Sequence, residues 1–134
     1  MVEIAEMRRR FDNSPCALYH GMKLVELSHG YAKVELKLKD EFLNWENIIH
    51  GGIIATLLDQ AFGCACNTLE LIHVAVQINI QFFSAAPVGE TIYAESRVLR
   101  AGKKVGMSEM RVFSSKDETI ATATGTTVCI GSRS

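Results

Sequence analysis

Asp59 is the residue of this 134-residue sequence whose surroundings point most directly to chemistry. It is the only acidic or basic side chain between His50 and Glu70, in a segment that is otherwise almost entirely apolar. Burial destabilises a carboxylate and raises its pKa toward the range of a general base. We therefore expect Asp59 to be partly buried and to act as a base or a nucleophile. The alternative interpretation is a capped loop or an exposed helical stripe, made of Thr56, Asp59, Gln60 and Gly63.

A second group of candidate residues, Asn44, His50, Gly51 and Gly52, lies just before this segment. Two glycines at the start of a helix let a substrate approach the backbone closely. The unpaired N–H groups of a first helical turn, at the positive end of the helix dipole, suit a developing oxyanion. A His-Gly-Gly turn is weak evidence alone, but an aspartate nine residues after the histidine makes the pattern much more specific.

The spacing of these candidates has a geometric consequence. Gly51 and Asp59 are eight residues apart, which corresponds to about 12 Å along a helix axis. Within one chain, that separation is too large for both residues to act on one small reacting group. Two antiparallel copies bring Asp59 of one chain to the Gly51 turn of the other. The spacing therefore predicts a two-fold homodimer with two equivalent composite sites.

Two helices are expected to hold these residues in place. Residues 4–11 predict a short first helix, which ends at the Asp-Asn-Ser-Pro sequence of residues 12–15. From Gly52 to Leu69 apolar residues occur on nearly every side, a pattern that predicts an 18-residue buried helix. This helix is the expected spine of the domain.

The rest of the chain predicts antiparallel strands. They are expected at residues 22–27, 32–39, 73–83, 91–100, 104–113 and 120–130, with a bend or bulge at Gly125. One face of the third strand is expected to carry Val74, Val76, Ile78, Ile80 and Phe82. Strands segregated from one central helix predict an α+β fold, a curved antiparallel sheet wrapped round one long buried helix. Residues 1–134 are expected to form a single domain.

Composition and charge argue against several classes of protein. The balance of 14 basic and 15 acidic residues argues against a nucleic-acid partner. No apolar stretch is long enough for a membrane span, and no signal peptide is visible, so we expect a cytoplasmic protein without a membrane partner. The four cysteines form no CxxC pair and the four histidines no HxxxH spacing, so we expect no metal site and interpret the cysteines as buried, reduced thiols.

These motifs, together with the segment VQINIQFFSAAPVGE at residues 76–90, resemble the hotdog-fold acyl-CoA thioesterases of the phenylacetate-degradation (PaaI) type. The resemblance covers residues 18–130 and includes the order of the elements. It implies hydrolysis of an acyl-CoA thioester, aromatic such as phenylacetyl-CoA or of short to medium chain length, without a cofactor. It also implies a homo-oligomer. A dimer of dimers, a tetramer, is expected, and contacts through helices or through sheets remain open.

The resemblance also implies roles for individual residues. Asp59 matches the catalytic carboxylate, a general base or a nucleophile, and Gly51 matches the glycine whose N–H polarises the thioester carbonyl. His50 and Asn44 match the pair that orients the thioester. The hairpin expected to contact the nucleotide and pantetheine of CoA contains Arg100, Lys103 and Lys104.

The sequence departs from the family pattern at two positions. Asn47 stands where some relatives have a glycine, so either Asn44 or Asn47 supplies the side-chain amide, and the spacing favours Asn44. Ala75 stands where relatives have a serine or threonine that positions the attacking water. Gln77 is the candidate substitute for that hydroxyl and a further candidate contact for the substrate.

Two other functions are compatible with the same fold. A hotdog hydratase or dehydratase uses an aspartate followed closely by a histidine, whereas here His50 precedes Asp59. A non-catalytic protein that binds acyl-CoA or another small ligand is the second alternative, and the missing hydroxyl at Ala75 is the reason to consider it. Loss of turnover with retained CoA binding in Asp59→Asn distinguishes catalysis from binding.

Overall fold

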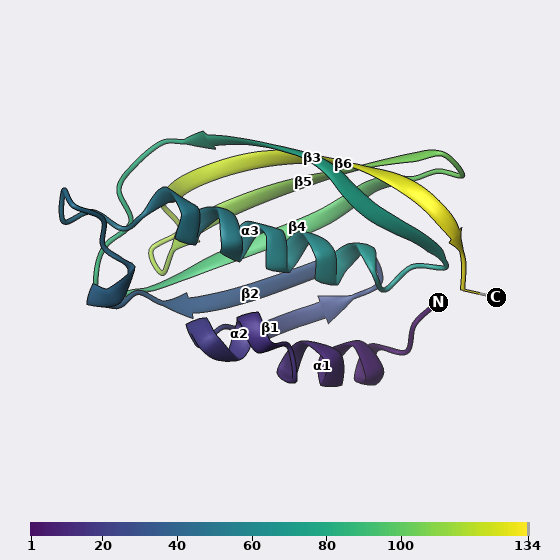
Figure 1. Ribbon diagram of the computed structural model, residues 1–134, viewed down its shortest axis with the longest axis horizontal. Helices are drawn as coiled ribbons and strands as arrows, with labels where there is room; N and C mark the ends of the chain where they lie inside the picture. Colours follow the sequence, from purple (N-terminus) through teal and green to yellow (C-terminus); the bar gives the residue numbers. More distant parts are fainter. Residues whose placement is uncertain (134) are drawn as a thin grey trace.

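The computed structural model describes residues 1–133. The elements, in chain order, are α1 (Ile4–Asp12), α2 (Pro15–His20), β1 (Lys23–Ser28), β2 (Tyr31–Lys37), η1 (Asp40–Phe42), α3 (Gly51–Cys66), β3 (Leu71–Phe82), β4 (Thr91–Ala101), β5 (Val105–Ser114) and β6 (Thr119–Ser132). The six strands form one sheet in the order β1-β2-β4-β5-β6-β3, and every neighbouring pair is antiparallel. The sheet curves along α3, with α1 and α2 beside β1 (Figure 1). This arrangement confirms the predicted α+β fold.

The core lies between α3 and the inner face of the sheet. On α3, Leu57, Leu58 and Ala61 are completely buried, and the helix packs mainly against β2 and β4. The strict alternation predicted around β2 is confirmed, because its apolar residues are at most 1 % exposed, namely Ala32, Val34, Leu36 and Leu38. Burial of these aliphatic side chains supplies the main stabilisation of the platform that holds α3.

The long helix is shorter than the sequence pattern predicted. It ends at Cys66 rather than Leu69, because two polar side chains bond to its last carbonyl groups. The Nδ2 group of Asn67 donates to the carbonyl of Gly63 at 2.7 Å, and the hydroxyl of Thr68 donates to that of Ala65 at 2.8 Å. These bonds satisfy groups that a helix end leaves without partners and so stop the helix.

The expectation that this helix is buried on every side is also wrong. Asp59 is exposed in the single chain, and the neighbouring polar stripe is only partly covered, at Thr56, Gln60 and Gly63. The exposed stripe weighed from the sequence is therefore present. It leaves the carboxyl group of Asp59 accessible along the side of α3.

A bulge in β3 changes which of its residues share a face. Ala75 pairs with Thr127 and Gln77 with Thr126, so Val76 is an extra residue without a partner in β6. Because Thr126 and Thr127 point to opposite faces, Ala75 and Gln77 do so as well. The expected single apolar face from Val74 to Phe82 is therefore wrong.

Of the bend or bulge predicted at Gly125, the bulge is not formed, since the register of this residue with Ile78 and Ser108 is regular. Its small size is required by packing instead. A Cβ at this position would lie 2.5 Å from Cζ of Phe62, a ring of α3 that packs directly on the backbone of β6. The glycine thus sets how closely the helix approaches the sheet.

The sequence pattern also missed α2, because Pro15 was interpreted as the end of a helix. Pro15 instead begins α2, a position where its fixed φ and missing N–H are tolerated.

Of the four free cysteines, Cys64 and Cys66 are buried as expected, but Cys16 is exposed and Cys129 is partly exposed.

No helix within residues 1–133 combines the length and the apolar character needed to cross a membrane. In the same part of the chain, no three His, Cys, Asp or Glu side chains gather in an arrangement that holds a metal ion.

Candidate active site

The side chain and backbone of His50 cap the N-terminus of α3. Its Nδ1 accepts the N–H of Gly52 at 2.9 Å, and its carbonyl accepts the N–H of Ile53 at 2.9 Å. No acceptor for the N–H of Gly51 exists within residues 1–133. Cζ of Phe82 lies 3.5 Å from the place a Cβ on Gly51 would take, so an aromatic ring flanks this N–H group. The arrangement presents one free donor at the positive end of the helix dipole.

The loop before this cap is shaped by Asn44. Its Oδ1 accepts the N–H groups of Glu46 at 2.9 Å and Ile48 at 3.2 Å, which leaves the Nδ2 group without a partner among the described residues. Asn47 adopts a left-handed conformation with φ of 58°. Asparagine, like glycine, tolerates that conformation. The structure thus gives Asn44 and Asn47 different roles in one turn.

Asp59 lies in the middle of α3, between two clefts. One, of about 360 Å³, separates α3 from α1, and the other, of about 260 Å³, separates α3 from the start of β3. No group within residues 1–133 forms a hydrogen bond or an ion pair with the carboxyl group of Asp59. Partial desolvation by the surrounding protein raises its pKa above the ordinary value, as the sequence predicted.

The cleft against β3 has a mainly apolar lining. Its titratable groups are the carboxyl of Asp59, the thiol of Cys66 and the imidazole of His73. Ala75, the position at which the resemblance implied a hydroxyl in relatives, lies in this lining. Gln77 is absent from it, because the bulge at Val76 turns Gln77 to the opposite face of the sheet. Within one chain, Gln77 therefore does not replace the missing hydroxyl.

The predicted basic hairpin lies at the turn between β4 and β5. Arg100, Lys103 and Lys104 are all exposed there. The hairpin backbone is attached to the rest of the sheet at two points, through Nε2 of His73 to the carbonyl of Gly102 at 2.9 Å and through the N–H of Cys129 to that of Lys104 at 2.9 Å. The role of His73 could not be predicted from the sequence, because its partners Gly102 and Thr127 are distant along the chain. The only local sign of a close contact was the pair of glycines on either side of Lys103 and Lys104, Gly102 and Gly106.

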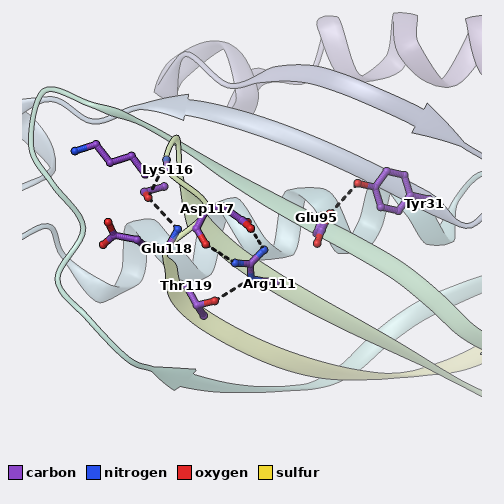
Figure 2. A network of polar contacts seen from close by, with 8 residues as sticks. Tyr31, Glu95, Arg111, Lys116, Asp117, Glu118 and Thr119 are labelled. Atoms are coloured by element: carbon purple, nitrogen blue, oxygen red, sulfur yellow. Dashed lines mark hydrogen bonds and ion pairs between the residues drawn. The ribbon is translucent and has the colours of Figure 1, made fainter.

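The outer face of the sheet, away from α3, carries a further group of charges (Figure 2). The Tyr31 hydroxyl donates to Glu95 at 2.9 Å, and burial, followed by this bond, raises the pKa of Tyr31. Arg111 binds Asp117 and Thr119, both within 2.9 Å. Glu95 pairs across strands with Arg111, and Arg97 with Glu109. This face therefore alternates in charge and lines a cleft of about 550 Å³.

The profile of the thioesterase superfamily matches residues 46–121, which include the cap at His50, all of α3 and strands β3 to β5. The chain therefore belongs to the thioesterase superfamily, and its sheet wrapped round α3 is the hotdog fold.

Individual relatives agree with this assignment. The acyl-coenzyme A thioesterase PaaI of Escherichia coli is 30 % identical over 121 residues, which cover 90 % of this chain and 86 % of that protein. Its solved structure superimposes with a TM-score of 0.87 over 97 % of this chain and 98 % of the other, at 27 % identity. Human acyl-coenzyme A thioesterase 13 is 34 % identical over 89 residues, 65 % of this chain and 64 % of that protein. A Streptococcus mutans structure with bound acetyl-CoA has a TM-score of 0.79 at 26 % identity, over 84 % and 91 % of the two chains.

Proposed function

We propose that this chain, as a single domain, hydrolyses acyl-CoA thioesters, aromatic or of short to medium length, to the free acid and CoA. The family assignment supports this activity, as do the E. coli relative named acyl-CoA thioesterase and the neighbour solved with acetyl-CoA. One observation carries the proposal. The same helix has a free N–H at Gly51 and, eight residues later, a partly desolvated carboxyl group at Asp59 that has no partner within the described chain.

The proposed chemistry uses both groups. The N–H of Gly51 donates to the thioester carbonyl oxygen, where negative charge develops in the transition state. Asp59 removes a proton from a water molecule whose oxygen attacks the carbonyl carbon. The C–S bond then breaks, and CoA leaves as a thiolate that takes up the proton. In the nucleophilic route, an oxygen of Asp59 attacks the carbonyl carbon first and the C–S bond breaks, so that CoA leaves as a thiolate. Water then cleaves the resulting anhydride to the free acid and the Asp59 carboxylate, and the proton that it releases goes to the thiolate. A single turnover in ¹⁸O-labelled water separates the routes, because only the second can place label in Asp59.

His50 and Asn44 are proposed to orient the thioester beside Gly51. Because Nδ1 of His50 accepts from Gly52, the proton of the neutral imidazole is on Nε2, which makes that nitrogen the donor toward a ligand. Asn44 offers its Nδ2 group, since its Oδ1 is already used by the loop. These assignments give each polar group at the turn a separate partner.

A second copy of the chain is proposed to complete the site. The strand β3 is an edge of the sheet, and large apolar side chains are exposed on it and on the loop before α3, namely Val76, Phe82, Phe83, Trp45 and Ile48. We call these five residues the β3-edge patch. An exposed sheet edge with an apolar patch favours pairing with another chain. Phe82 connects the patch to Gly51 directly, so a partner at this edge lies beside the free N–H group.

We also propose that two such dimers associate into a tetramer through the outer face of the sheet. The cross-strand pairs Glu95–Arg111 and Arg97–Glu109 make that face self-complementary in charge. Reversal of one charge in Arg97→Glu is expected to leave dimers in sedimentation, whereas Lys37→Glu, on a strand end, leaves the tetramer intact.

The exposed basic hairpin is the proposed binding site for CoA. Arg100, Lys103 and Lys104 are proposed to bind the phosphates of CoA, since their exposed charges converge on one hairpin.

A cytoplasmic location is proposed as well, because the four thiols are unpaired and that compartment keeps thiols reduced.

The experiment that tests the activity is a thiol-release assay with a panel of acyl-CoA substrates. Asp59→Asn is expected to reduce kcat by at least about 10²-fold, the contribution of a general base. Asp40→Asn, which removes an exposed carboxylate without side-chain partners, is the matched control and is expected to retain full activity. Absence of thiol release from every substrate would overturn the proposal, and calorimetric titration with CoA would then test the alternative of a binding protein.

The composite site has its own test. Asp59→Asn and Gly51→Pro are each expected to be inactive, but their mixture is expected to recover about one quarter of the native activity. Half of the randomly formed dimers are mixed, and each of these has one site with both native residues. A mixture without activity, although mixed dimers form, would show that both groups act within one chain.

A further inference from the structure

His73 is a buried side chain that joins β3 to the β4–β5 turn and to β6. It belongs to β3, it is 5 % exposed, and both of its ring nitrogens have partners outside β3. Nε2 lies 2.9 Å from the carbonyl of Gly102, at the end of β4, and Nδ1 lies 2.7 Å from Oγ1 of Thr127 on β6. A carbonyl only accepts, so Nε2 donates to Gly102. In the neutral ring Nδ1 then accepts the Thr127 hydroxyl.

The backbone around this imidazole has the glycines that its position requires. A Cβ on Gly106 would lie 2.5 Å from Oγ1 of Thr127 and 3.0 Å from Cε1 of His73. A Cβ on Gly102 would lie 2.8 Å from the carbonyl oxygen of Val105. Both distances are too short for a side chain. Gly106 therefore leaves the room that the imidazole of His73 occupies, and Gly102 lets the turn close tightly against Val105. The contact is therefore a specified feature of the chain.

The two ends of this contact belong to different parts of the proposed site. On one side, His73 lies in the lining of the cleft that contains Asp59. On the other side, it holds the hairpin that carries Arg100, Lys103 and Lys104, through the residue next to the lysine pair. His73 is thus a direct link between the carboxyl cleft and the exposed cations.

We propose that His73 is a positioning residue, which holds the basic hairpin in a fixed place beside the cleft that contains Asp59, so that one CoA molecule contacts both. The inference rests on the proposed function, because it assigns the hairpin to the phosphates of CoA. Without the His73 bond, the Cys129–Lys104 bond holds one end of the turn, and the backbone around Gly102 has to be ordered when the ligand binds, which weakens binding. The bond from His73 moves the ordering into the folding of the protein, so the cations are already in place for the substrate.

The test compares two substrates with the same acyl group, acyl-CoA and the acyl thioester of N-acetylcysteamine, which lacks the nucleotide. His73→Ala is expected to raise KM for acyl-CoA about tenfold, the effect of ordering about one backbone residue on binding. Its effect on kcat/KM is expected to be larger for acyl-CoA than for the truncated substrate, which does not reach the hairpin. His73→Gln is expected to restore KM, because its amide supplies one donor for Gly102 and one acceptor for Thr127.

A milder variant and a binding measurement make the outcomes distinguishable. Thr127→Val removes only the Nδ1 partner and provides a milder variant if His73→Ala does not fold. Equal losses on both substrates, or a loss of kcat in the glutamine variant, would overturn the positioning role. If the native chain hydrolyses neither substrate, the proposed function fails. Calorimetric titration with CoA then tests His73 alone, and an unchanged Kd in His73→Ala overturns the inference.

Discussion

Gly52 donates its backbone N–H to Nδ1 of His50 over 2.9 Å, so the side chain that precedes α3 caps the helix that carries Asp59. The carbonyl of the same residue accepts the next N–H along, that of Ile53. The cap therefore satisfies the second and third N–H groups of the helix and leaves the first, that of Gly51, for a ligand. This division of donors at one helix end is the basis of the first two predictions.

Removal of the free N–H group is expected to stop hydrolysis without unfolding the helix. Gly51 is the first residue of α3, where proline is favoured, and His50 already has the extended conformation that precedes proline, with φ of −59° and ψ of 131°. Gly51→Pro is expected to keep the native melting temperature and to lower kcat by about 10²- to 10³-fold. Gly51→Ala, which keeps the N–H, is the control. Equal activity of the proline and alanine variants would remove Gly51 from the mechanism.

Two variants are expected to distinguish the role of His50 as a helix cap from its proposed role in orienting the thioester. Asparagine is a favourable N-cap residue, so His50→Asn is expected to preserve stability, whereas His50→Ala loses about 1 kcal/mol. For a domain of this size that loss lowers the melting temperature by about 4 °C. Both variants lack the Nε2 donor and are expected to show the same loss of kcat/KM. Full activity in His50→Asn would mean that His50 only caps the helix.

The raised pKa of Asp59 predicts how stability responds to pH. Desolvation makes the folded protein hold the proton of this carboxyl group more tightly than the unfolded chain does. Above the unfolded pKa, ionisation of Asp59 therefore opposes folding, and the cost grows until the folded pKa is passed. Asp59→Asn is expected to melt at a higher temperature than the native protein at pH 7, with the difference vanishing below about pH 4. Asp40→Asn controls for the lost charge, and a lower melting temperature of Asp59→Asn at pH 7 would contradict the desolvation.

The parts of the fold that could be predicted from the sequence are those where a local period determines the structure. The alternation along β2 and the apolar run of α3 are visible in the sequence itself, and both elements formed. The bulge at Val76 was invisible, because residues 74–82 alternate without interruption and only the pairing with β6 shows the extra residue. The end of α3 was misplaced for a similar reason, since the capping bonds of Asn67 and Thr68 do not affect hydrophobic periodicity.

The residues of the candidate site could likewise be predicted only where they lie close together in the sequence. Asp59, Gly51 and His50 belong to one continuous segment, so their spacing could be interpreted directly. His73 could not, because its partners Gly102 and Thr127 are 29 and 54 residues away. Gly125 was noticed for the wrong reason, because the ring that requires it, Phe62, comes from a different element. Contacts that depend on two distant segments carry no local signal.

Gly63 is expected to show a conflict between stability and substrate range. It lies four residues after Asp59, on the same side of α3, and it borders both clefts. A Cβ at this position would meet no other atom within 4 Å, so packing within the chain does not require glycine. Glycine inside a helix costs up to about 1 kcal/mol relative to alanine. Gly63→Ala is therefore expected to raise the melting temperature by about 4 °C.

The same variant is expected to lose activity on large acyl groups, because the added methyl group fills space beside the carboxyl group of Asp59. The comparison is kcat/KM for phenylacetyl-CoA against acetyl-CoA, with sedimentation to establish that the oligomer is unchanged. A fall for phenylacetyl-CoA alone identifies Gly63 as part of the acyl-binding surface. Equal kcat/KM ratios in the native and variant proteins, with the expected rise in melting temperature, would place the acyl group away from this side of α3.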